Sequence, residues 1–114
     1  MGLEIAKNKL KEIISFDLID IEGTINTKGN YVHLNSTSKH SNLETKYGFT
    51  ITIAGLSLVN NDEAIEPILA KALDDIYQYE ISNAKDLGAS SKIIRIDELI
   101  GYELKVFIIE KTKN

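Results

Sequence analysis

The stretch NDEAIEPILAKALDDIYQYEI, residues 61–81, carries the longest periodic pattern in this sequence. Its apolar residues recur three and four positions apart, which is the spacing of residues on one face of an α-helix. These residues are Ile65, Ile68, Leu69, Ala72, Leu73, Ile76 and Tyr77. We therefore expect a long helix that buries one apolar stripe against another layer of the fold.

The start of this helix has two interpretations, because proline lacks the N–H that an interior helical residue donates. Asn60, Asn61 and Asp62 have side-chain oxygens that can accept hydrogen bonds from the first turn of a helix. The helix either begins near Asp62 and loses one hydrogen bond at Pro67, or it begins at Glu66 with Pro67 in its first position.

The stretch YGFTITI, residues 47–53, predicts the strand on which this helix packs. Large apolar residues alternate with smaller ones, as in a strand that buries one face. One face carries Phe49, Ile51 and Ile53, and the other carries Thr50, Thr52 and Ala54. Gly55 changes the parity, so we expect a bulge, a bend or the end of the strand there. The predicted common core contains Ile51, Ile53, Ile68, Leu69, Leu73, Ile76, Leu104 and Val106.

The residues before this strand predict a short helix and two further strands. The apolar stripe of the helix consists of Leu3, Ala6, Leu10, Ile13 and Ile14. Residues 16–21 predict a first strand, residues 24–30 a hairpin connection, and residues 31–35 a second strand.

Residues 35–46, NSTSKHSNLETK, contain Leu43 as their only apolar residue. Loops of this length are uncommon inside compact domains, and they are usually binding segments or disordered ones. We expect a loop that contacts a partner outside its own fold, and the alternative is a disordered tip without a role.

Residues 92–98 and 101–111 predict two closing strands around Leu99, Ile100 and Gly101. Residues 106–109 are apolar on both faces, so they and the first helix carry more apolar surface than a small two-layer monomer easily covers. Both segments are therefore candidates for a subunit interface.

The predicted order is helix, three strands, helix, two strands. This order indicates an α+β fold, in which two helices pack on one mostly antiparallel sheet of about five strands. The 114 residues fit one domain, residues 1–114, without repeats or a linker.

Composition argues against several classes of function. The chain has no cysteine, so disulfides, thiolate nucleophiles and cysteine-based zinc sites are excluded. A net charge of −4 disfavours general nucleic-acid binding, which depends on neutralising phosphates with Lys and Arg. No segment reaches the run of about 18 apolar residues that a membrane-spanning helix needs. We expect no membrane partner and no sequence-specific nucleic acid.

Candidate chemistry is sparse. His33 and His40 share no helix face with each other or with a carboxylate, so a metal site is not expected. The glycines do not cluster into a phosphate-binding loop, so no nucleotide cofactor is expected either.

Two carboxylate pairs, Asp17 with Asp20 and Asp74 with Asp75, are the remaining candidates for acid–base chemistry. Such chemistry needs a shared pocket and opposed environments, which the sequence does not indicate. We expect a protein that is not an enzyme.

Three stretches together resemble one known family. They are YGFTITIAGLSL at residues 47–58, the long helix with its small-residue stripe, and the closing pair KIIRIDELI and YELKVFIIEKT at residues 92–100 and 102–112. With the short N-terminal helix and the hairpin, this pattern resembles the tail terminator proteins of tailed phages, in particular the Mu-like and contractile-tail members. The resemblance covers nearly the whole chain and lies in element order and hydrophobic pattern.

The resemblance implies a structural assembly protein without catalytic residues, metals or cofactors. Proteins of that family form homo-oligomeric rings, typically hexamers, that cap the finished tail tube, stop its polymerisation and join it to the head connector. The implied partners are further copies of the chain, the tail tube protein and the head connector. The implied location is the cytoplasm during assembly and then the tail of a virion or phage-like particle.

The residues expected at interfaces come from the first helix, the polar loop and the last strand. They are Leu3, Leu10, Ile13, Ser36, Lys39, His40, Asn42, Phe107 and Ile109. An alternative is a small acidic immunity or inhibitor protein, monomeric or dimeric, that binds a basic protein partner at an acidic patch.

Overall fold

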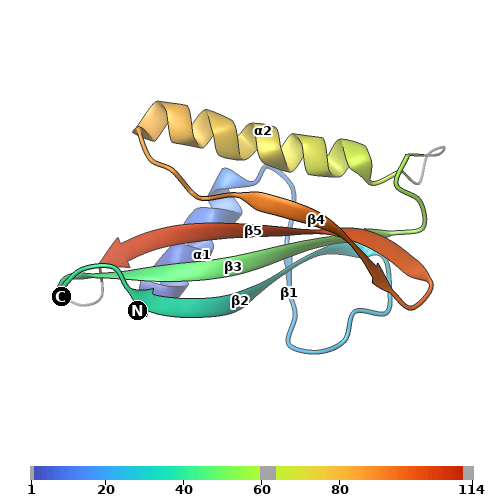
Figure 1. Ribbon diagram of the computed structural model, residues 1–114, viewed down its shortest axis with the longest axis horizontal. Helices are drawn as coiled ribbons and strands as arrows, with labels where there is room; N and C mark the ends of the chain where they lie inside the picture. The colour runs from blue at the N-terminus through green and yellow to red at the C-terminus, as the bar shows by residue number, and fades with distance from the viewer. Residues whose placement is uncertain (1, 60–63, 112–114) are drawn as a thin grey trace.

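The computed structural model describes residues 2–59 and 64–111 and confirms the α+β fold in the expected element order (Figure 1). The elements are α1 (Gly2–Ile13), β1 (Ile19–Asp20), β2 (Gly29–Lys39), β3 (Glu44–Gly55), α2 (Glu66–Asn83), β4 (Ser90–Ile96) and β5 (Leu99–Lys111). The molecule is a flattened slab of 47 × 31 × 20 Å.

One sheet contains the five strands in the order β1-β2-β3-β5-β4. The β2–β3 ladder runs from Gly29 opposite Ala54 to Lys39 opposite Thr45, with a register shift between Leu34 and Ser36. The longest strand, β5, pairs antiparallel with β3 along one side and with β4 along the other. The last strand in the sequence is therefore an inner strand of the sheet.

The long helix α2 begins at Glu66, with Pro67 in the first turn. The second interpretation of its start is confirmed, because a proline in that turn leaves no interior hydrogen bond unmade. Ile65 is the residue at the N-cap, and it contributes no side-chain hydrogen bond. The expected capping residues at positions 60–62 lie outside the described residues.

The main core lies between the sheet and the two helices. Figure 1 shows α1 behind the strands and α2 running along the side of β4 and β5. The predicted core residues Ile51, Ile53, Ile76, Leu104 and Val106 are buried in it, and Ile68, Leu69 and Leu73 are half-buried against it. Tyr77 was expected in the same stripe, but its side chain is 53% exposed. It lies at the margin of a stripe whose buried centre is Ala72 and Ile76.

A second, smaller cluster lies on the opposite face of the sheet, which we call the open face. It consists of Tyr31, Ala54 and Leu99, with Ile21, Ile25 and Ile96 packed against them. The segment between β1 and β2 supplies Ile21 and Ile25 and so covers one end of the open face. Among the described residues, no helix covers the rest of that face.

The expected hairpin between the first two strands is wrong. Residues 16–21 form only the two-residue strand β1, and β1 runs parallel to β2 instead of antiparallel. The connection from residue 21 to residue 28 crosses the end of the sheet, because Ile21 and Ile25 gain burial on the open face. A tight turn at residues 28–30 would leave both side chains in water.

The expected long loop at residues 35–46 is also wrong. β2 continues to Lys39 and β3 already begins at Glu44, so these residues form the outer half of a β-hairpin. Their backbones pair from Ser36 opposite Gly48 to Lys39 opposite Thr45. This backbone pairing orders a stretch whose side chains are almost all polar.

Candidate functional site: sheet edges and the projecting hairpin

The polar residues that the sequence offers for catalysis or metal binding do not come together. His33 lies in the middle of β2, whereas His40 lies at the hairpin tip. Within residues 2–59 and 64–111, no group of three or more His, Asp or Glu side chains is arranged to hold a metal ion.

Asp20 takes part in an ion-pair cluster on the surface. Its carboxylate lies 2.9 Å from the Lys11 Nζ and 3.4 Å from the Lys7 Nζ, which joins β1 to α1. The hydrogen bond from Lys11 and the charges of both lysines lower the pKa of Asp20 against a small opposing effect of burial. Asp17, its predicted catalytic partner, is exposed and outside this cluster.

Asp75 links the two helices. Its carboxylate accepts a 2.9 Å hydrogen bond from the backbone N–H of Ser15, just after α1, and lies 3.4 Å from the Lys71 Nζ. Burial acts to raise the pKa of Asp75, but the hydrogen bonds from Ser15 and Lys71 outweigh it and lower the pKa. Its sequence neighbour Asp74 is exposed. Both carboxylate pairs therefore divide into one structural and one solvated residue.

The predicted interface residues fall into three groups. Leu10 is completely buried in the chain's own core, so its assignment to an interface is wrong. Leu3 and Ile13 are half-buried against the same core. Leu10 occupies the centre of the α1 stripe, whereas the other two occupy its margins, and the sequence pattern alone did not separate them.

The second group of predicted interface residues lies on the projecting hairpin. Ser36, Lys39, His40 and Asn42 are all exposed there. The turn is closed by hydrogen bonds from the backbone N–H groups of His40 and Ser41 to the Glu44 carbonyl, at 3.0 and 3.1 Å. These polar side chains therefore sit on paired strands and a closed turn.

The third group, Phe107 and Ile109, lies half-buried on the open face. The Phe107 ring packs against two glycines, since a Cβ added to Gly48 or Gly88 would lie 3.0 or 3.1 Å from it. The Lys46 Nζ lies 4.4 Å from the centre of the ring on the solvent side. The ring is therefore covered by the Lys46 ammonium group and by the backbones at Gly48 and Gly88, and by no helix among the described residues.

The edge of β5 is open near its C-terminal end. The Phe107 N–H donates a 2.8 Å hydrogen bond to the Leu87 carbonyl, and β4 pairs with β5 only up to Lys105. Alternate residues of a strand direct their N–H and C=O groups to the same side. Ile109 therefore directs its N–H and C=O groups to the side where β4 would lie if it were longer, whereas the Lys111 carbonyl lies against Gly2 of α1, where an added Cβ would be 3.0 Å from it.

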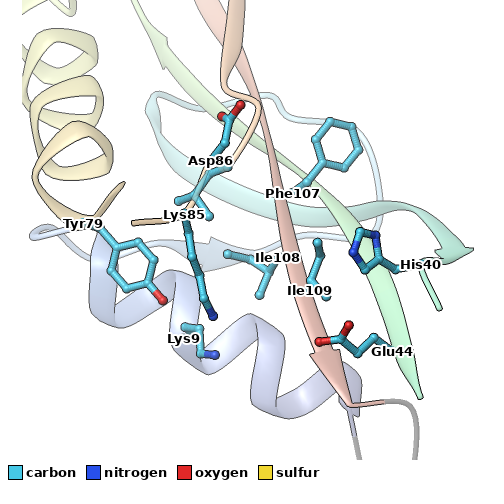
Figure 2. Close-up of a pocket in the computed structure, with 10 residues that line it drawn as sticks. Lys9, His40, Glu44, Tyr79, Lys85, Asp86, Phe107, Ile108 and Ile109 are labelled. Carbon is cyan, nitrogen blue, oxygen red and sulfur yellow. The ribbon is translucent and has the colours of Figure 1, made fainter. Parts of the chain in front are cut away.

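A cavity of about 210 Å³ straddles this open edge (Figure 2). On the helix side of β5, the side chains of Lys9, Lys85 and Tyr79 point toward one another. On the other side of the strand lie His40 and Glu44 from the hairpin. The floor is formed by Leu87, Ile108 and Ile109.

The lining of this cavity carries two lysines, Lys9 and Lys85, and two carboxylates, Glu44 and Asp86. The Lys9 ammonium group pairs with the Glu110 carboxylate. Asp86 points away from the lysines and accepts a 2.8 Å hydrogen bond from the Gly88 N–H. In the described part of the chain, no carboxylate forms an ion pair with Lys85. One ammonium group at the cavity is therefore left without a counter-charge.

The two outer edges of the sheet differ in charge. The edge strand β4, SSKIIRI, carries Lys92 and Arg95 and exposes 58% of Ile93. At the opposite edge, the segment around β1 carries exposed Asp17 and Glu22, and Ile19 is 55% exposed. Lys92 pairs with the Glu103 carboxylate at 3.7 Å, so Arg95 is the cation of the β4 strand without an ion-pair partner in the described part of the chain. Each edge has an isoleucine in contact with solvent.

The sequence analysis missed the cavity and the opposed edges. Lys85 and Tyr79 lie on or just after α2, and nothing in their spacing indicates Lys9 or β5 as neighbours. A signal was present for the β4 edge, because Lys92 and Arg95 flank two isoleucines in a strand without an acidic residue. These charges indicate an exposed sheet edge only when β4 is known to lie at the edge of the sheet.

Comparison of the chain with protein-family models and with curated proteins finds no match. In the described part of the chain, neither helix combines the length and the apolar character needed to cross a bilayer.

Proposed function

We propose that this protein is a non-enzymatic assembly protein that acts as a homo-oligomeric ring, in the manner of a phage tail terminator. In this role it caps a tail tube and joins it to a head connector. The observation that carries the proposal is the pair of unlike sheet edges. The β4 edge carries Arg95 without an ion-pair partner among the described residues, the β1 edge carries exposed Asp17 and Glu22, and each edge exposes an isoleucine.

Unlike edges favour a head-to-tail contact between copies. Such a contact uses two different surfaces of the chain, so it repeats from copy to copy and gives a ring when the rotation closes. Lys92 and Arg95 of one copy would then face Asp17 and Glu22 of the next, while Ile93 and Ile19 lose contact with water.

The shape of the molecule also supports this role. The hairpin extends two paired strands with exposed polar residues, which suits contact with a neighbouring copy or with a tube below the ring. The alternative of an acidic inhibitor receives less support. Lys7 and Lys11 already neutralise Asp20, the central residue of the acidic segment.

The first test measures mass in solution by light scattering and examines the same sample by electron microscopy. A ring of several copies is the expected result. A chain that remains monomeric at high concentration and in the presence of tail tubes would rule out the proposal, and specific binding of that monomer to a basic protein would favour the inhibitor.

A charge-reversal series tests the edges themselves. Arg95→Glu is expected to yield folded monomers, and Arg95→Glu combined with Glu22→Lys is expected to recover part of the assembly. Glu4→Lys changes an exposed residue of α1 by the same charge and serves as the control for Glu22→Lys. Assembly that is insensitive to Arg95→Glu would place the contact elsewhere.

A further inference from the structure

We infer that the open edge of β5 at Ile109 binds an extended acidic peptide segment of a partner protein by strand addition. The partner places an acidic side chain on the helix side of the sheet, where Lys85 and Tyr79 receive it. This binding site is distinct from the edges that the proposed ring uses, and it does not depend on the ring.

The backbone of β5 provides the first part of the argument. Ile109 directs its N–H and C=O groups to the side that β4 leaves free, and no hydrogen bond to those groups is found in the described residues. A strand edge with free donors and acceptors is a template for an added strand. The hydrogen bond between the Phe107 N–H and the Leu87 carbonyl ends the paired part of this edge and fixes where an added strand begins.

The cavity around this edge provides the second part. Its lining comes from both sides of the sheet, with Tyr79, Lys85 and Leu87 on one side and His40 and Glu44 on the other. A strand added to β5 would direct successive side chains alternately to these two sides. The cavity of about 210 Å³ can therefore receive side chains of an added strand on either side of the strand's backbone.

Charge identifies the class of peptide. On the helix side, Lys9 is already paired with Glu110, so Lys85 is the ammonium group that lacks a counter-ion. Tyr79 lines the same cavity, and its hydroxyl can donate a second hydrogen bond. An acidic side chain opposite Ile108 would reach both groups, whereas its sequence neighbours would lie beside Ile109 on the open face. The preferred segment therefore has an acidic residue between two apolar ones.

The test uses two capped pentapeptides, Thr-Val-Glu-Val-Thr and Thr-Val-Lys-Val-Thr, at concentrations up to about 1 mM, because a short strand binds weakly. Binding is followed through the backbone amide signals of the full chain by NMR. The Glu peptide is expected to shift the amide signals of Ile109 and Lys111, and the Lys peptide is expected to bind at least tenfold more weakly. Absence of these shifts with the Glu peptide, or equal binding of the two peptides, overturns the inference.

Two variants separate the contributions of backbone and charge. Ile109→Pro removes the N–H on the free side and leaves the pairing with β3 intact, since proline is tolerated on the unpaired side of a strand. It is expected to abolish binding, with Ile109→Val as the matched control that keeps the N–H. Lys85→Glu is expected to reverse the preference between the two peptides, and Lys28→Glu, at an exposed lysine outside this cavity, is its control.

Retention of binding by Ile109→Pro, with the fold verified by its amide spectrum, overturns strand addition. Concentration-dependent shifts of the Ile109 and Lys111 signals without peptide would assign the edge to a second copy of the chain, and would also overturn the inference. Because the readout is made at low protein concentration, a failure here is distinguishable from a failure of ring assembly.

Discussion

The two faces of β3 are almost equally buried, but by different means. Phe49, Ile51 and Ile53 are completely buried beneath the helices, whereas Thr50 and Thr52, on the open face, are 1% and 3% exposed with no helix above them in the described structure. The open face is shielded by the longer side chains of neighbouring strands, such as Lys105 opposite Thr50 and Glu103 opposite Thr52. Low exposure therefore does not by itself indicate a stabilising apolar core.

The largest expected effect tests this difference directly. Phe49→Ala removes a completely buried ring and should lower the free energy of unfolding by about 3 to 5 kcal/mol. Lys105→Ala removes a side chain of the open face near the same level of the sheet and should cost less than about 1 kcal/mol. Denaturant unfolding measures both, and equal losses would mean that the two faces contribute alike.

Gly48→Ala concerns a tightly packed place on the open face. The added Cβ would lie 2.4 Å from the Ser36 Oγ and 3.0 Å from the Phe107 ring. The Ser36 hydroxyl can rotate, but the ring is also held by Gly88, so we expect a loss of about 1 to 3 kcal/mol in the free energy of unfolding.

Gly23→Ala is the matched control, because its added Cβ would meet no atom within 4 Å. If Gly48→Ala unfolds at the same denaturant concentration as this control, the Phe107 ring is not confined between the glycines.

Asp75 tests the helix-covered side at its margin. Its pKa in the folded chain lies below the ordinary value of 3.8, so the unfolded chain binds more protons at acidic pH. The stability that Asp75 contributes is present above about pH 4 and is lost as the pH falls through its lower folded value.

Asp75→Ala should cost about 1 kcal/mol at neutral pH, because it removes the acceptor for the Ser15 N–H. Unfolding curves recorded between pH 7 and the acidic range should converge for the wild type and this variant as the pH falls. A difference that stays constant across that range would exclude the carboxylate charge as its cause.

The smallest effect is expected at the hairpin tip. Leu43 is 72% exposed, so Leu43→Ser should change the free energy of unfolding by less than about 0.5 kcal/mol. If ring assembly weakens in this variant while its melting temperature stays unchanged, the tip contacts another molecule. A clear loss of stability would instead show that the tip packs on its own chain.

The sequence was sufficient for elements with strong periodicity. The helix stripe around Ala72 and Ile76 and the alternation of Phe49, Ile51 and Ile53 identify the core because each pattern places its large apolar residues on one face. Pro67 limited the start of α2 to two positions, and the structure selects Glu66. These are local signals, and local signals determine the existence and type of an element.

The sequence did not predict the strands whose structure depends on pairing with another strand. Residues 36–38 have no apolar alternation, yet they extend β2 because Gly48, Tyr47 and Lys46 lie opposite them in the register of the hairpin. The direction of β1 could not be predicted either, since a two-residue strand gives no signal for parallel pairing. The open edge at Ile109 depends on where β4 ends, which no single stretch of sequence encodes.

The position of β5 also has a consequence for synthesis. It is the last of the described strands to be made, but it lies between β3 and β4 and holds both in the sheet. Until residues 99–111 emerge from the ribosome, β4 has no partner and β3 presents an inner edge to water. A nascent chain of this protein therefore stays an open, association-prone hairpin until its final strand closes the sheet in one step.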